Sequence, residues 1–203
     1  MILPRDFYAR PTLDVARDLV GKVLVHDTRG GPTAGVIVET EAYIGESDPA
    51  CHAAPGRTRR NAPLYGPPGF AYVYLNYGIH YLVNAVTEPE GSPAAVLIRA
   101  LEPIEGEPLM RRRRRAGAAL DPASLCRGPG NLTRALGISL RENRADLTGS
   151  RLRIEERQLP GRDVVWGPRV GISVGVEQAW RCYAADSPAV SMFKSGTRAS
   201  RRR

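Results

Sequence analysis

The chain has 203 residues, of which 42% are hydrophobic, and carries a formal net charge of +8 with a pI near 9.9. This length can fill one sizeable core, and no composition shift divides it, so we expect one domain over residues 1–194 and a basic, disordered tail at 195–203. The positive charge indicates a polyanionic partner such as nucleic acid, although a ribosome or a membrane surface would also suit it. No apolar run could span a bilayer and no signal-peptide pattern opens the chain, so we expect a soluble, cytoplasmic protein that is monomeric and has no membrane partner.

The three cysteines exclude two further classes of protein. Cys51, Cys126 and Cys182 lie far apart and form no C-x-x-C pair, which argues against a disulfide framework and against thiolate zinc or iron–sulfur sites. His52 directly follows Cys51, but adjacent residues of an extended segment point to opposite faces. We therefore expect no metal site and no cofactor.

The predicted elements form a mixed α/β (α+β) domain. An apolar stripe predicts a helix that begins at Pro11 or Thr12 and ends at Gly21, which a hairpin of strands at 22–27 and 34–43 follows. Further strands are predicted at 70–75, 80–86 and 94–100, and weaker ones at 152–156, 169–174 and 181–184. The sheet should be largely antiparallel and curved, with peripheral helices.

The strand V-I-V-E-T-E-A-Y carries two carboxylates. Its alternation predicts a half-buried strand whose polar side presents Glu39, Glu41 and Tyr43. Residues 44–69 then lack any apolar period, and a loop of this length in a compact domain is usually functional or disordered. Arg57, Arg59 and Arg60 give this loop phosphate-binding chemistry, which favours the functional alternative.

The following segment F-A-Y-V-Y-L-N-Y-G-I-H-Y-L-V-N predicts a hairpin. The turn lies at Asn76-Tyr77-Gly78, where glycine supplies a positive φ and the preceding ring is displayed at the tip. A helix is expected near Glu105, with Arg111–Arg115 toward its C-terminal end, as the helix dipole prefers. That arginine run is either a solvated helix end or a phosphate contact. A turn at 126–130 should open a short helix that Gly137 closes.

Together these motifs resemble the alkyladenine (3-methyladenine) DNA glycosylase family. The matching segments are E-T-E-A-Y-I-G, D-P-A-C-H, G-x-x-Y-V-Y-x-x-Y-G-x-x-Y-x-x-N and V-L-I-R-A-L-E-P, within a resemblance that runs from residue 11 to about 174. The resemblance implies a single mixed α/β domain that acts on duplex DNA containing damaged purines.

The resemblance also implies a role for each matching residue. Glu41 would be the general base that activates water, which Arg99 and the main-chain carbonyl of Val170 would help to position. The flipped base would lie among Tyr43, His52 and Tyr74, and Asn84 would help to exclude normal guanine. The remaining implied role is that of Tyr77, the wedge that would fill the gap in the duplex.

The chemistry of base excision agrees with these roles. A purine alkylated at N3 or N7 is a cationic leaving group, so its release passes through an oxocarbenium-like sugar and needs a positioned water beside a carboxylate. A base inside a duplex must first be extruded and held between aromatic faces. No lysine lies in the motif segments to act as a Schiff-base nucleophile, which favours a monofunctional enzyme. The sequence leaves open which lesion is preferred among 3-methyladenine, 7-methylguanine, hypoxanthine and ethenoadenine.

Two other classes remain open at this point. A non-catalytic nucleic-acid-binding module would explain the charge and the tyrosines, but it leaves Glu41 as an unexplained repulsion next to phosphate. A metal-dependent nuclease would use Glu39, Glu41, Asp48 and His52 as ligands. Such an enzyme would cut the strand and stop when a chelator is added.

Overall fold

The computed structural model describes residues 1–191, and its central element is the long strand β2 (Gly31–Ile44). It lies in an eight-stranded sheet in which six strands follow the order β3-β4-β5-β2-β1-β6. Of the other two strands, β8 pairs with β2 and β7 pairs with β8. Every pairing is antiparallel. The other strands are β1 (Val23–Thr28), β3 (Ala71–Asn76), β4 (His80–Val86), β5 (Ala94–Glu105), β6 (Leu152–Glu155), β7 (Val164–Gly167) and β8 (Arg181–Ala184).

Strand β2 changes partner along one of its edges. β5 follows it along the opposite edge, whereas β1 pairs with residues 31–36 and β8 pairs with residues 39–41. The β2–β5 register shifts on both sides of Glu39, and such bulges bend a strand and redirect its side chains. The strand is thereby bent where its two carboxylates lie.

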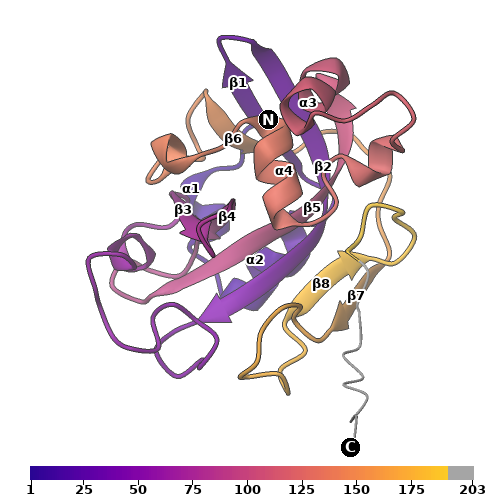
Figure 1. The fold of residues 1–203 in the computed structure, drawn as a ribbon. Helices are drawn as coiled ribbons and strands as arrows, with labels where there is room; N and C mark the ends of the chain where they lie inside the picture. The colour runs from indigo at the N-terminus through magenta and orange to yellow at the C-terminus, as the bar shows by residue number, and fades with distance from the viewer. Residues whose placement is uncertain (192–203) are drawn as a thin grey trace, which may run out of the picture.

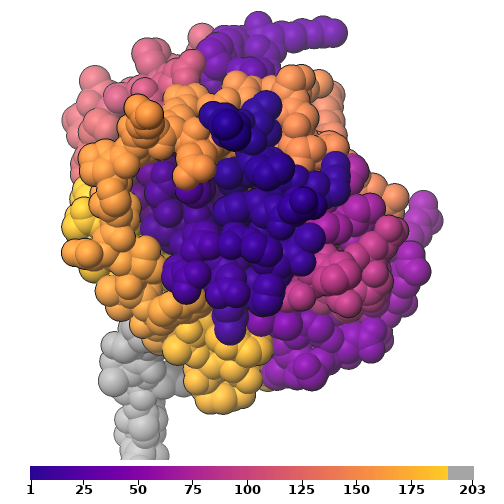
Figure 2. Space-filling view, turned by 180° about the vertical axis from the view of Figure 1, so that it is seen from behind, coloured from indigo at the N-terminus to yellow at the C-terminus, as the bar shows by residue number. Residues whose placement is uncertain are grey.

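Short helices cover the sheet on both sides. α2 (Thr12–Leu19) packs against β2 and β5, and α4 (Pro129–Leu136) packs against β4, β5 and the arginine-rich α3 (Glu107–Arg114). In Figure 1 α4 lies in front of the sheet and α2 behind it, and Figure 2 shows the N-terminal residues at the centre of the rear face. The remaining helical segments are α1 (Arg5–Tyr8) and the 3-10 turns η1 (Ala62–Tyr65), η2 (Pro122–Ser124) and η3 (Leu140–Glu142).

The main core joins the sheet to these helices. Leu19 of α2, Ile98 of β5 and Leu136 of α4 are completely buried members of one apolar cluster. Burial of a side chain of this size contributes about 1.5–3 kcal/mol relative to leaving it exposed. The same packing fixes β2 and β5, which carry the polar groups described below.

The predicted mixed α/β fold is confirmed, but two local predictions were wrong. The segment 169–174 is not a strand, because Gly171 has a φ of 79° and the Val170 N–H bonds a side chain instead of a neighbouring strand. β7 was not predicted. The expected half-buried character of β2 is also incorrect, since both faces are covered from Thr33 to Ala42.

The arginine run at the C-terminal end of α3 is only partly exposed. Arg111 bonds Glu107 and loop carbonyls, Arg113 bonds Thr28 and the Ala135 carbonyl, and Arg114 bonds the Leu125 carbonyl. Arg112 and Arg115 remain exposed. The run therefore mainly ties α3 to the loops around it.

Two further sequence predictions concern the C-terminal end of the chain and the absence of membrane-spanning segments. Residues 195–203, expected to form a disordered tail, lie outside the described residues, as does the end of the domain expected at residue 194. None of the helices in residues 1–191 combines the length and apolar character that crossing a membrane requires.

Candidate active site

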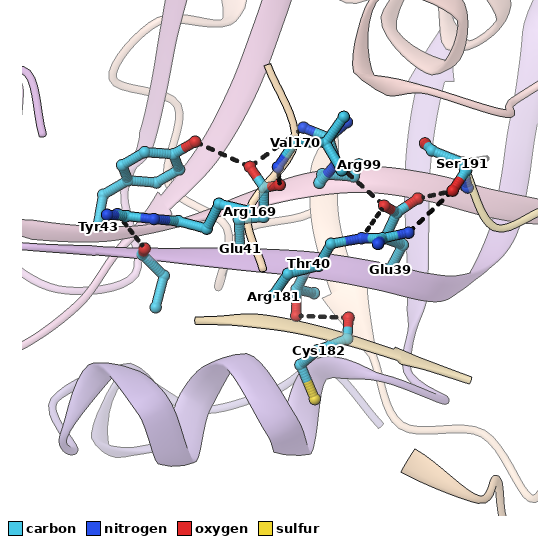
Figure 3. A network of polar contacts seen from close by, with 11 residues as sticks. Glu39, Thr40, Glu41, Tyr43, Arg99, Arg169, Val170, Arg181, Cys182 and Ser191 are labelled. Atoms are coloured by element: carbon cyan, nitrogen blue, oxygen red, sulfur yellow. Dashed lines mark hydrogen bonds and ion pairs between the residues drawn. The ribbon is translucent and has the colours of Figure 1, made fainter. Parts of the chain in front are cut away.

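Glu41 is buried at the centre of the polar network on β2. Its Oε1 accepts a hydrogen bond of 2.6 Å from the Val170 N–H, and its Oε2 accepts bonds from the Tyr43 hydroxyl at 2.8 Å and Arg99 Nη1 at 3.1 Å. The side chain is completely inaccessible to solvent. Figure 3 shows these groups converging on the carboxylate from β2, β5 and the segment before β8.

The environment of Glu41 acts on its protonation in two directions. Burial raises the pKa of Glu41 above its ordinary value of 4.5, whereas Arg99, the Val170 N–H and the Tyr43 hydroxyl favour the charged form. The net direction is upward, because desolvation is the largest effect. A carboxylate with a raised pKa is a stronger base than an exposed one, which suits proton abstraction from water.

Glu39 lies on the same face of the strand but has different partners. It accepts hydrogen bonds from Arg99 Nε at 3.1 Å, Arg181 Nε at 2.6 Å and the Ser191 N–H at 2.8 Å. Arg99 thus joins the two carboxylates, as Figure 3 shows. A buried acid bound by two guanidinium groups holds those groups in place.

A cavity of about 580 Å³ opens in front of Glu41. Ligand pockets of roughly 300–1,000 Å³ enclose small molecules, so a single purine would fit. The predicted site residues Tyr43, His52, Tyr74, Tyr77, Asn84, Arg99 and Val170 all line this cavity. Glu41 itself does not line the cavity, but it is hydrogen-bonded to three residues that do, Tyr43, Arg99 and Val170.

An aromatic wall forms one side of the cavity. The rings of Tyr72 and Tyr74 stack with centroids 5.3 Å apart, and His52 meets Tyr74 edge-on at 4.5 Å. The Nδ1 of His52 shares a hydrogen bond of 2.9 Å with the Tyr72 hydroxyl. Burial, together with Arg60, lowers the pKa of His52, which favours a neutral ring at physiological pH. Such a wall offers a flat face to a base.

Asn84 closes the inner end of this wall. It lies opposite Tyr72 in the β3–β4 ladder and donates from Nδ2 to the Tyr72 carbonyl at 3.0 Å. Its side chain is nearly buried and lines the cavity. The hydrogen bond fixes the orientation of the amide, so that a polar group is held at a defined place in the pocket.

Tyr77 lies at the tip of the β3–β4 hairpin, as predicted. Both Tyr77 and Gly78 have positive φ values, 48° and 70°, and the Ile79 N–H closes the turn on the Asn76 carbonyl at 3.0 Å. The Tyr77 side chain is 87% exposed although it borders the cavity. Because a left-handed φ is unfavourable for tyrosine, folding alone does not explain this residue.

The loop arginines lie outside the cavity. Arg57, Arg59 and Arg60 are all exposed, with Arg57 over the Tyr65 ring and Arg60 5.9 Å from the centre of the Tyr74 ring. Arg60 also donates to the Leu75 carbonyl at 3.4 Å. Two of these positive charges are therefore held next to aromatic residues near the cavity and remain open to solvent.

The candidate ligands of the nuclease alternative do not converge. Asp48 is buried in an ion pair with Arg169, His52 contacts the tyrosine wall, and both glutamates are bound to Arg99. Within residues 1–191 no three His, Cys, Asp or Glu side chains are grouped so that they could hold a metal ion.

Two features of the site were not predicted. Tyr72 belongs to the aromatic wall, and the alternation of strand residues could have identified it, because Tyr72 and Tyr74 share a face. The start of α4, residues 128–131, also lines the cavity. No sequence pattern relates that segment to the hairpin, since its position depends on tertiary packing.

The chain is similar to known proteins along most of its length. The family model described as Methylpurine-DNA glycosylase matches residues 6–188. A protein of Methanocella arvoryzae, provisionally named a 3-methyladenine DNA glycosylase, is 50% identical over 198 residues, which cover 96% of this chain and 98% of the relative. A protein of Prosthecochloris aestuarii with the same name is 48% identical over 92% of this chain and 89% of its own length. A third, from Rubrobacter xylanophilus, is 54% identical over 81% and 84%.

Proposed function

The chain belongs to the methylpurine-DNA glycosylase family, and we propose on that premise that it excises damaged purines from duplex DNA. It is a monofunctional glycosylase, a hydrolase of N-glycosidic bonds that leaves an abasic site in an intact strand. Its substrates are alkylated or deaminated purines of the class of 3-methyladenine, 7-methylguanine, hypoxanthine and ethenoadenine. It acts as a monomer on DNA inside the cell and needs neither a cofactor nor a metal ion.

In this proposal Glu41 is the general base. Its carboxylate takes a proton from a water molecule as the bond between sugar and base breaks, and its negative charge stabilises the oxocarbenium-like sugar. Arg99 positions the water, and the main-chain carbonyl of Val170 completes its contacts, as the family resemblance implies. The raised pKa of Glu41 supports the assignment, because it increases the basicity of the group.

The aromatic wall holds the extruded base. Extruding a paired base costs a few kcal/mol, and stacking on an aromatic ring returns about 1–3 kcal/mol per base. Tyr43, His52 and Tyr74 supply those faces, while the amide of Asn84 excludes the exocyclic amino group of normal guanine. Tyr77 enters the base stack in place of the lost purine, and the loop arginines Arg57, Arg59 and Arg60 hold the phosphates.

One observation supports this function most strongly. The residues that the sequence assigns to base binding, water activation and wedging come from four separate segments, residues 41–52, residues 74–84, Arg99 and Val170, and the fold gathers them around one cavity next to Glu41. A binding module would have no use for a buried carboxylate at that position. The alternative of a metal-dependent nuclease lacks support, because Asp48 is already bound to Arg169.

The experiment is a release assay on duplexes that each contain one lesion. Base release followed by strand cleavage only after alkali treatment supports a monofunctional glycosylase, and the rates across the panel identify the preferred lesion. Strand scission without alkali would argue for a nuclease. Loss of base release in excess chelator, restored by Mg²⁺ or Zn²⁺, would contradict the metal-independent mechanism.

Lysine chemistry gives a second check on the monofunctional assignment. Lys22 forms an ion pair with Glu156 and does not line the cavity, and Lys194 lies outside the described residues. Trapping with borohydride should therefore yield no covalent complex between protein and DNA, because such a complex needs a Schiff base. A trapped complex would show lyase activity.

A further inference from the structure

Arg169 connects three parts of the site, although it does not line the cavity. Its guanidinium forms a bidentate ion pair with Asp48, with Nη1–Oδ2 and Nη2–Oδ1 distances of 2.6 and 2.8 Å. Both side chains are completely buried. Planar, two-point contacts of this kind fix orientation as well as distance.

The same guanidinium holds the main chain on both sides of it. Nη1 donates to the Ala42 carbonyl of β2 and Nη2 to the Gly175 carbonyl, each at 3.1 Å. It also lies between two rings, 4.8 Å from the centre of Tyr43 and 5.1 Å from that of Trp180. Segment 169–175, which lacks any strand pairing, is thereby fastened to β2.

Asp48 extends this connection to the loop after β2. Its carboxylate accepts hydrogen bonds from the Ile44 N–H at 3.3 Å and the Ala50 N–H at 3.1 Å. The loop that follows carries His52 to the aromatic wall. One buried ion pair therefore joins the base-binding loop, the catalytic strand and the segment that contains Val170.

We propose that Arg169 is a positioning residue for base excision, which holds the Val170 peptide against Glu41 through its ion pair with Asp48. The inference rests on the proposed function, because Glu41 must be the base for its geometry to affect the rate. Val170 directly follows Arg169, and its N–H makes the shortest hydrogen bond to the Glu41 carboxylate, at 2.6 Å. A shift of segment 169–175 would weaken that bond first.

Loss of this hydrogen bond should change the pKa of Glu41 in a predictable direction. The Val170 N–H favours the charged form of Glu41 and lowers its pKa, so weakening the bond raises that pKa further. The other groups that act on Glu41 are Arg99 on β5, Tyr43 and Glu39 on β2, Tyr74 on β3 and Arg169 itself. Arg169→Lys keeps the positive charge and leaves the rest of this set in place, so the change in pKa reports the position of the segment.

The test compares pH profiles of single-turnover excision. For Arg169→Lys and for Asp48→Glu, which both keep the charges of the pair and change its geometry, we expect the acid limb to move to higher pH, with the rate lowered about tenfold near pH 6 and less near pH 8, the scale of one hydrogen bond to a charged group. Arg153→Lys is the control, because Arg153 is likewise held in ion pairs, with Asp27 and Glu155, but does not line the cavity. Its profile should coincide with that of the unaltered protein.

The outcomes separate the inference from the proposed function. If the unaltered protein releases no base, or if Glu41→Gln keeps the full rate, the proposed function fails. If that function holds but both variants keep the original acid limb, or lose the same fraction of the rate at every pH, Arg169 is not a positioning residue. Should Arg169→Lys fail to fold, Asp48→Glu decides by the same criteria. If neither variant folds, the pair serves only the fold and the inference is overturned.

Discussion

Arg99 donates a hydrogen bond of 3.1 Å to Glu41 inside the protein, where Glu41 is fully buried and Arg99 is only 6% exposed. Burial of either charge alone would be costly, and the pair reduces that cost only with additional hydrogen bonds. Arg99 donates one to Glu39, and Glu41 accepts one from the Val170 N–H. The two carboxylates of β2 therefore have separate tasks, and the following predictions distinguish them.

Replacement of Glu41 by glutamine removes the base and keeps the shape of the side chain. We expect excision to fall roughly 100-fold or more, the scale of losing general-base catalysis, while binding to lesion DNA is retained. Loss of the charge leaves Arg99 with Glu39 as its remaining carboxylate partner, so some stability should also be lost, and the rates are compared at a temperature where the variant is folded. A variant that excises at the original rate would remove Glu41 from the mechanism.

Glu39→Gln should act on stability. Glu39 binds Arg99, Arg181 and the Ser191 N–H, so loss of its charge leaves two buried guanidinium groups without their shared partner. We expect the free energy of unfolding to fall by about 2–3 kcal/mol, as measured by urea denaturation. At temperatures where the variant is folded, its excision rate should exceed that of Glu41→Gln. The reverse order of rates would make Glu39 the base.

The rate of excision should decrease as the pH is lowered, and this decrease should occur at a pH above the ordinary pKa of a glutamate side chain. A raised pKa means that Glu41 takes up its proton at a higher pH than an exposed carboxyl, whose ordinary value is 4.5, and the protonated form cannot accept a proton from water. Single-turnover rates between about pH 4.5 and pH 8 measure this limb. Circular dichroism over the same range excludes acid unfolding as its cause. If the rate decreases only at or below pH 4.5, the charged partners of Glu41 have a larger effect on its pKa than burial does.

Sequence reasoning predicted the strands and the hairpin that carry the candidate site residues. Glu41 and Tyr43 share a face of β2, and Tyr74 and Asn84 lie on a hairpin, so alternation and a glycine turn are enough to bring them together. Residues 169–175 could not be predicted in the same way. Their conformation depends on Arg169 and Asp48, which are 121 positions apart in the chain, and no local pattern encodes such a pair.

The loop arginines should determine the salt dependence of DNA binding. Arg59 is exposed, and replacing it by glutamine should weaken binding to damaged and undamaged DNA alike and reduce the slope of log K against log salt by about 1, as loss of one phosphate contact requires. Arg112 of α3 is also exposed and offers a matched comparison. If Arg112→Gln changes the slope and Arg59→Gln does not, the basic footprint lies on α3 and not on the loop.

Tyr77 offers the sharpest test of base flipping. Its ring is 87% exposed at the hairpin tip and packs against little of the protein, so Tyr77→Ala should barely change the melting temperature. The variant loses the ring that fills the gap in the duplex. The stacking lost with it is about 1–3 kcal/mol, which lowers the population of the flipped state by roughly 5- to 150-fold.

The size of that loss should depend on how firmly the lesion is paired. A lesion in a mismatch, a bulge or a single strand costs less to extrude, so its excision gains less from a wedge. Excision by Tyr77→Ala should therefore fall most for a well-paired lesion and least for a bulged one, while the acid limb set by Glu41 stays in place. An equal loss on paired and bulged lesions would mean that the ring contacts the substrate in some other way. A large drop in melting temperature would mean that it stabilises the hairpin, and that its positive φ of 48° reflects packing rather than DNA binding.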